Sequence, residues 1–176
     1  MATIERPGPD EYAPYYGAYV QNVGSGDVLE TLQAEIARTL DLLRRAPAEQ
    51  EGYRYETGKW SVREVVGHLV DTERLFSYRA LSFARGDAGP LPGMDQDQWV
   101  TTGGDSAPLA GLAEELAQVR GATISLYRRL DETSLARRGV ASGVEFSVRA
   151  FPFIIAGHEI HHRTLLVDRY GLGQAS

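Results

Sequence analysis

Two histidines lie one helical turn apart near the end of the chain, in the segment Gly157-His158-Glu159-Ile160-His161-His162. The sequence has four histidines in all, and the remaining one, His68, lies far upstream. Imidazole is the commonest protein ligand for zinc, nickel and related ions. Three such ligands gathered in a helical bundle would leave coordination positions open for chemistry. His68, His158 and His162 are therefore the candidate ligands of a divalent metal ion.

The histidines of the last segment are placed unequally on its predicted helix. A helix turns by about 100° per residue, so His158 and His162 fall near the middle of the apolar face and His161 falls towards its edge. Burying imidazole nitrogens without partners costs on the order of 1–3 kcal/mol each. A shared metal ion is the simplest partner for the pair, and we expect His161 to be dispensable.

The residues around His68 in the sequence do not determine its role. It lies on the flank of the apolar stripe of its predicted helix, beside Thr72, which suits a residue that lines a groove between helices. A hydrogen-bonded histidine at the edge of the core explains His68 equally well. Asp71 could orient its imidazole, although pairing with a neighbouring arginine explains that carboxylate more simply.

The segment from His158 to His162 also satisfies H-E-x-x-H, the zinc-protease pattern in which the glutamate is the general base. Such enzymes need a third ligand, usually downstream, and the acid found there, Asp168, lies on the same predicted helix only six residues on. Glu159 is also partly turned away from the direction of the histidines. The protease interpretation is therefore disfavoured, and the role of Glu159 is left open.

Composition narrows the classes of function. The chain has 176 residues, no cysteine and a net charge of −6. Any metal must therefore be held by nitrogen and oxygen ligands, and binding to nucleic acid is disfavoured because it draws on clustered Lys and Arg. The N-terminal segment has no apolar run like that of a signal peptide, and no stretch is long and apolar enough to span a membrane. We expect a cytoplasmic protein that acts on a small molecule.

Four amphipathic segments with 3–4 spacing of their apolar residues predict helices. They cover residues 28–45, 62–85, 107–130 and 148–170. Ser61 with Glu64 has the form of a capping box, and so has Asp27 with Glu30. The chain is therefore predicted to be an all-α four-helix bundle in a single domain, 1–176, with residues 1–26 as an arm packed along it.

Three further expectations concern the connections and the start of the last helix. The connection 86–106 is long enough to run back along a helix, so helices two and three of the bundle can be parallel, and loops of this length are often functional. Residues 53–55 and 144–146 could form short extended pieces near the ends of the bundle. Pro152, in the first turns of the last helix, could kink that helix or delay its start.

The chain resembles the DinB/YfiT-like superfamily, because its histidine positions, caps and loop lengths agree together. The matching segments are Lys59–Glu64, His68–Arg74, Leu91–Asp95 and Ile155–His162, together with Pro14–Tyr16 of the arm. The resemblance implies a bundle of up-down-down-up connectivity, a divalent metal ion such as zinc or nickel held by His68, His158 and His162, and a homodimer.

Members of that superfamily include thiol S-transferases and isomerases that use bacillithiol, mycothiol or glutathione, as well as metal-dependent hydrolases. Three neutral imidazoles leave the full charge of the ion available to acidify a thiol or a water molecule. We therefore expect a metal-dependent enzyme, a thiol S-transferase of the bacillithiol type. A hydrolase of a small ester or amide, and a bundle that binds a metal or ligand without catalysis, remain alternatives.

Overall fold

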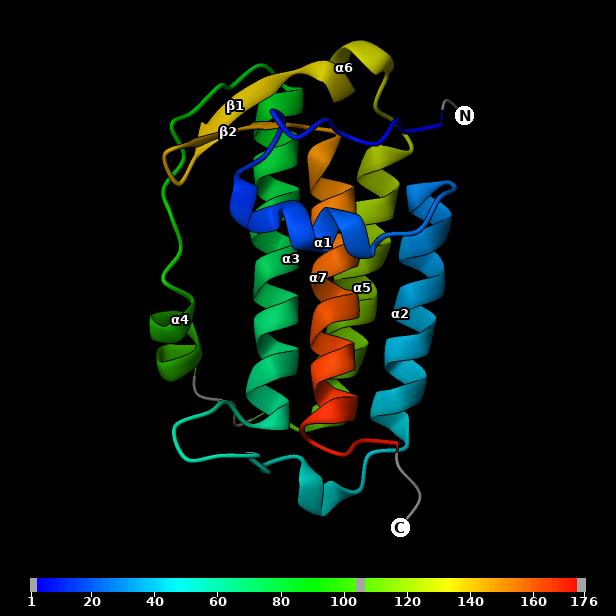
Figure 1. Cartoon of the computed structure of the whole chain (residues 1–176), viewed down its shortest axis with the longest axis vertical. Helices are drawn as coiled ribbons and strands as arrows, with labels where there is room; N and C mark the ends of the chain where they lie inside the picture. Colours follow the sequence, from blue (N-terminus) through cyan, green and yellow to red (C-terminus); the bar gives the residue numbers. More distant parts are fainter. Residues whose placement is uncertain (1–2, 104–106, 174–176) are drawn as a thin grey trace.

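The computed structural model describes residues 3–103 and 107–173 and is built around four long helices that lie side by side (Figure 1). These are α2 (Val28–Arg44), α3 (Val62–Ala84), α5 (Leu109–Tyr127) and α7 (Ala150–Asp168). Each corresponds to one predicted amphipathic segment, and no end differs by more than three residues. The all-α bundle predicted from the sequence is confirmed.

The connectivity of the bundle is also the predicted one. Helices α3 and α5 run in one direction and α2 and α7 in the other, which is the up-down-down-up order (Figure 1). Around the bundle α3 packs against α5, α5 against α2, α2 against α7, and α7 against α3. The connection from α3 to α5 returns along the outside of α3 and contains the short helix α4 (Gln96–Gly103). Residues 104–106 of this connection lie outside the described part of the chain.

Local signals in the sequence fix where the helices begin and end. The Ser61 hydroxyl accepts from the Glu64 amide at 3.2 Å, and the Glu64 carboxylate accepts from the Ser61 amide at 2.6 Å, so the capping box is complete. Asp27 caps α2 through its carboxylate, which accepts from two amides of the first turn. Helix α7 begins at Ala150, two residues later than predicted, and continues through Pro152, which lies in the first turn, where an amide hydrogen has no intrahelical partner.

A hairpin and a short helix cover one end of the bundle (Figure 1). The hairpin pairs β1 (Arg138–Ala141) with β2 (Val144–Ser147) in antiparallel register, and α6 (Glu132–Ala136) precedes it. Strand β2 confirms the extended piece expected at 144–146. The expectation for residues 53–55 was wrong: they form no strand, and the rings of Tyr53 and Tyr55 pack on Tyr170, two residues beyond the end of α7.

The described part of the N-terminal arm packs on the bundle through its short helix. It forms a 3-10 turn, η1 (Pro14–Tyr16), and then α1 (Gly17–Asn22), which crosses α7 (Figure 1). Another 3-10 turn, η2 (Ala48–Gln50), lies between α2 and α3. The arm comes so close to α7 that a Cβ atom added to Gly157 would lie 1.9 Å from the carbonyl oxygen of Tyr19. Glycine at 157 is thus what allows α1 to cross α7.

None of the helices among the described residues combines the length and apolar character that crossing a bilayer requires.

We predict that Gly157→Ala destabilises the protein by about 1–3 kcal/mol, because the added methyl group must push the backbone of Tyr19 away from α7. Thermal or urea unfolding measures the effect. Gly121→Ala in α5 is the matched control, since a Cβ atom there meets no atom within 4 Å, and it should be neutral or stabilising by up to about 1 kcal/mol. Equal stability of the two variants would contradict the close approach of the arm.

Candidate metal centre

Three imidazoles from two helices converge in the bundle. His158 and His162 project from α7 and His68 from α3, and all three side chains are buried. The Nε2 atom of His158 lies 3.1 Å from that of His68 and 3.0 Å from that of His162. The three ligand atoms all lie within 4.8 Å of one another. The structure thus places His68 with the pair on α7 and not as an isolated residue at the edge of the core.

The separations suit a single metal ion. Ligand nitrogens about 2.0–2.1 Å from an ion, at angles of about 90–110°, are about 2.9–3.4 Å apart, and the two separations from His158 are 3.0 and 3.1 Å. Three neutral nitrogen donors suit zinc, nickel and related ions and leave positions for other ligands. The residues present therefore fit the divalent metal ion that the sequence predicted.

Burial keeps these imidazoles neutral. It lowers the pKa of His68 to about 4 and that of His162 to about 3. Burial also lowers the pKa of His158 well below its ordinary value, and the neighbouring His162 and His68 lower it further. The carboxylate of Asp97, on α4, acts in the opposite direction on His68. At neutral pH each imidazole therefore keeps one nitrogen lone pair that can bind a cation.

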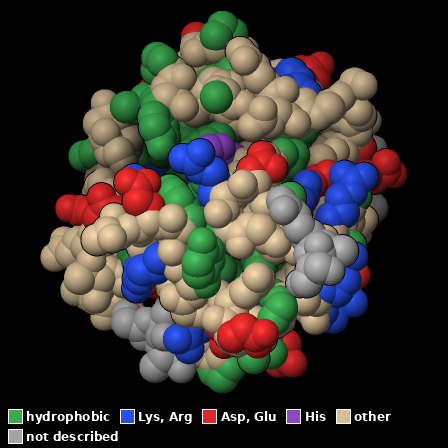
Figure 2. Space-filling view, turned by 60° about the horizontal axis from the view of Figure 1, so that its bottom comes forward, with side chains coloured by type: hydrophobic (Ala, Val, Ile, Leu, Met, Phe, Trp, Pro, Cys, Tyr) green, Lys and Arg blue, Asp and Glu red, His purple; other side chains and the backbone are tan. Residues whose placement is uncertain are grey.

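The rings around the cluster come from different parts of the chain. The half-buried indole of Trp60 lies 4.8 Å from the His68 ring, and the phenol ring of Tyr19, from the arm, lies 5.3 Å from that of His158. The hydroxyl of Thr72 is 3.3 Å from Nδ1 of His68, so the side chain that contacts this imidazole is Thr72 and not Asp71. Figure 2 shows histidine only as a small patch among other side chains on this view of the surface.

His161 is exposed, and its ring lies against Tyr19. It belongs to none of the groups of ligand atoms found among the described residues. That His161 is dispensable for metal binding stays a prediction.

Glu159 faces a buried arginine instead of the imidazoles. Its carboxylate accepts from Nη1 of Arg120 at 2.7 Å, and both side chains are 2% exposed. A glutamate held in this way does not lie where a zinc protease needs its general base. The disfavoured protease interpretation gains no support from the structure.

Arg120 is the central residue that the sequence analysis did not single out. On α5, it donates from Nε and Nη2 to the two carboxylate oxygens of Glu73, at 2.8 and 2.9 Å. Its Nη1 also donates to the carbonyl oxygen of Leu32, at 2.8 Å. One guanidinium therefore bonds to α2, α3 and α7. The signal in the sequence was an arginine on the apolar stripe of its helix, between Leu116 and Thr123.

The connection between α3 and α5 influences the histidine site mainly through the charge of Asp97. The Asp95 carboxylate accepts from the Gln98 amide at 3.0 Å at the start of α4, and α4 packs on α3. Asp97 lies close enough for its charge to act on His68. Trp99 is 40% exposed, and no contact of its side chain gives it a role at the cluster.

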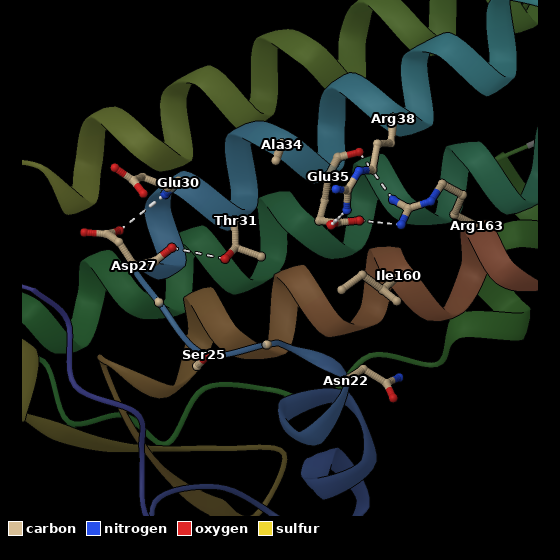
Figure 3. A pocket seen from close by; sticks show the side chains of 12 residues that line it. Asn22, Ser25, Asp27, Glu30, Thr31, Ala34, Glu35, Arg38, Ile160 and Arg163 are labelled. Carbon is tan, nitrogen blue, oxygen red and sulfur yellow. Dashed lines mark hydrogen bonds and ion pairs between the residues drawn. The ribbon is translucent and has the colours of Figure 1, made fainter.

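A separate hollow of about 570 Å³ lies between α2, α7 and the turn after α1 (Figure 3). In it the guanidiniums of Arg38 and Arg163 both pair with the carboxylate of Glu35. Nη1 of Arg163 also lies 3.3 Å from the carbonyl oxygen of Glu35. These ion pairs join α7 to α2, and the imidazole cluster lies outside this hollow.

The chain is similar to proteins of one superfamily. A family model described as the DinB superfamily matches residues 31–166. A protein from Oceanobacillus iheyensis, named as a proposed metal-dependent hydrolase, is 29% identical over 136 residues, which make up 76% of each chain.

Two solved structures share the fold. YfiT from Bacillus subtilis, described as a proposed metal-dependent hydrolase with an unusual four-helix bundle topology, has a TM-score of 0.71 and 20% identity. The match covers 96% of this chain and 95% of YfiT. A mycothiol-dependent maleylpyruvate isomerase has a TM-score of 0.69 and 9% identity, over 88% of this chain and 63% of the isomerase.

We predict that the metal-free protein loses stability between about pH 6.5 and pH 4 in part through these imidazoles. The unfolded chain takes up protons near the ordinary histidine pKa of 6.5, whereas the folded protein resists doing so until about pH 4 at His68. Stability therefore falls as the pH falls. Urea unfolding at pH 7, 6 and 5 should show a smaller fall for His68→Leu than for the wild type, and parallel curves would contradict the buried, neutral state of His68.

Proposed function

This chain belongs to the DinB superfamily, and from that premise we propose that it is a metal-dependent enzyme whose divalent ion is held by His68, His158 and His162. The observation that carries the proposal is the convergence of three buried Nε2 atoms. The similarity to a protein named as a proposed metal-dependent hydrolase supports it. We propose zinc or nickel as the ion, because three imidazoles are a donor set that suits both.

The residues of the chain have distinct parts in this proposal. The imidazoles bring no charge, so a divalent ion, when bound, would keep its full charge and lower the pKa of a thiol or water molecule that coordinates it. Burial excludes bulk water from the imidazole edges, and Thr72 contacts Nδ1 of His68. The rings of Trp60 and Tyr19, both half-buried, are placed to contact a small substrate.

We propose thiol transfer to an electrophile as the reaction, with a low-molecular-weight thiol of the bacillithiol type as one substrate. The shared fold with an isomerase named as mycothiol-dependent supports this choice, although one fold hosts many chemistries. The alternative is hydrolysis of a small ester or amide, which the name of the Oceanobacillus relative favours. Both reactions use an acidified nucleophile at the same three histidines.

The metal assignment predicts the behaviour of four single variants. His68→Ala, His158→Ala and His162→Ala should each lose most of the bound zinc or nickel, because two imidazoles bind an ion far more weakly than three. His161→Ala is the matched control and should keep one ion per chain. Elemental analysis of the purified proteins measures the stoichiometry, and retention of the ion by His158→Ala would contradict the assignment.

The reaction is tested on zinc- or nickel-loaded protein supplied with a small thiol and a haloarene or epoxide. We expect thioether formation that depends on the added metal and falls at least about 100-fold in His158→Ala, with the same protein inactive on nitrophenyl esters. Ester hydrolysis that needs the metal and His158, without thiol transfer, would favour the hydrolase. Inactivity on both substrate classes, with metal bound, would replace the enzyme by a metal-binding role.

A further inference from the structure

We propose that the buried cluster of Glu73, Arg120 and Glu159, called here the Arg120 cluster, positions the histidines and thereby sets the metal affinity of the site. This inference rests on the proposed function, because it assumes that His68, His158 and His162 hold a metal ion. The residues of the cluster are not themselves proposed ligands of the ion or contacts of the substrate. They act through the helices that carry the imidazoles.

The two ligand-bearing helices are each held by the same guanidinium. Helix α3 carries His68 and, five residues later, Glu73, while α7 carries His158 and next to it Glu159. Arg120 reaches from α5 and binds both carboxylates at 2.7–2.9 Å. Sliding or rotating α3 against α7 would therefore break a buried ion pair. The clamp fixes the register at which His68 meets the pair on α7.

The cluster also lies directly behind one of the ligands. A small cavity of about 10 Å³ has Glu73, Arg120, Glu159 and His158 in its lining. Such a volume is close to the minimum that holds one water molecule, so the charged groups and His158 line a space too small for more than one molecule. A change in the cluster reaches His158 without any element in between.

Stability alone does not account for such a cluster. All three side chains are 2–3% exposed. Buried ion pairs are expensive to desolvate, and apolar residues of similar volume often give an equally stable or more stable protein. A bidentate guanidinium accepts only a narrow range of carboxylate positions, so these charges restrict the geometry more narrowly than apolar packing does. The place where fixed geometry is needed here is the adjoining histidine site.

The test compares two variants of the cluster with the wild type. Arg120→Lys keeps the charge but loses the fork that binds Glu73 through two nitrogens. The triple variant Glu73→Leu, Arg120→Met, Glu159→Leu removes every charge and so leaves none unpaired. Each protein is stripped of metal, its zinc Kd is measured by competition with a chelator, the absorption spectrum of its Co²⁺ form is recorded, and its thermal unfolding is measured without metal.

We expect zinc affinity to fall about 10- to 100-fold in both variants and the Co²⁺ bands to shift or weaken. For the triple variant the loss should occur with a melting temperature at or above that of the wild type, a result that a merely stabilising role of the cluster would not give. If the triple variant does not fold, the same measurements on Arg120→Lys test the positioning role of the cluster.

Arg149→Lys is the matched control. Arg149 binds Glu11 through Nε and Nη2, each at 2.7 Å, and this pair ties the arm to the start of α7. It lies nine residues before His158, or about 13 Å along the helix. This variant should lower the melting temperature and leave the zinc Kd and the Co²⁺ spectrum unchanged.

The outcomes separate the two proposals. Absence of zinc binding in the wild type would overturn the proposed function, and the inference with it. Tight binding in the wild type that is lost in His158→Ala but unchanged in folded Arg120→Lys and triple variants would overturn the inference alone. An equal loss of affinity in Arg149→Lys would also overturn it, because the effect would then follow stability and not the position of the cluster.

Discussion

The buried guanidinium of Arg120, on α5, bonds to each of the other three long helices. It bonds to a carbonyl oxygen on α2, a carboxylate on α3 and a carboxylate on α7 while its own backbone lies on α5. Charges inside a protein must be satisfied locally, and removing one partner of such a group typically costs about 3–5 kcal/mol. The four helices are therefore confined to positions at which all of these bonds exist together, and the remaining features of the core are built around that constraint.

The histidine cluster follows from the same confinement. Because α3 and α7 are held face to face, His68 lies against two imidazoles one helical turn apart, and burial keeps all three neutral. The arm closes one side, since Gly157 lets α1 cross α7 and brings the Tyr19 ring edge-on against the His158 ring. The site is thus formed by packing between segments far apart in the sequence, with rings on its rim and nitrogen donors at its centre.

Periodic features were predictable from the sequence, and pairings between helices were not. Apolar spacing gave the four long helices, the Ser61 capping box gave the start of α3, and the helical angle of 100° per residue placed His158 and His162 on one buried face. His68 remained undecided, because its partners lie on another helix. The role of Arg120 could not be predicted for the same reason. Its position on an apolar stripe indicates burial but does not identify the carboxylates that it binds. The short helices α1 and α4 depend on tertiary contacts and lacked a strong local pattern.

We propose that this packing gives one divalent ion three imidazole ligands and open positions. X-ray absorption at the zinc edge of the zinc-loaded protein tests it most directly, because multiple scattering from imidazole rings counts them. We expect three imidazole nitrogens at about 2.0–2.1 Å, with the remaining positions filled by light atoms that are not part of a ring. A spectrum with two or fewer imidazoles, or one dominated by carboxylate oxygens, would contradict it.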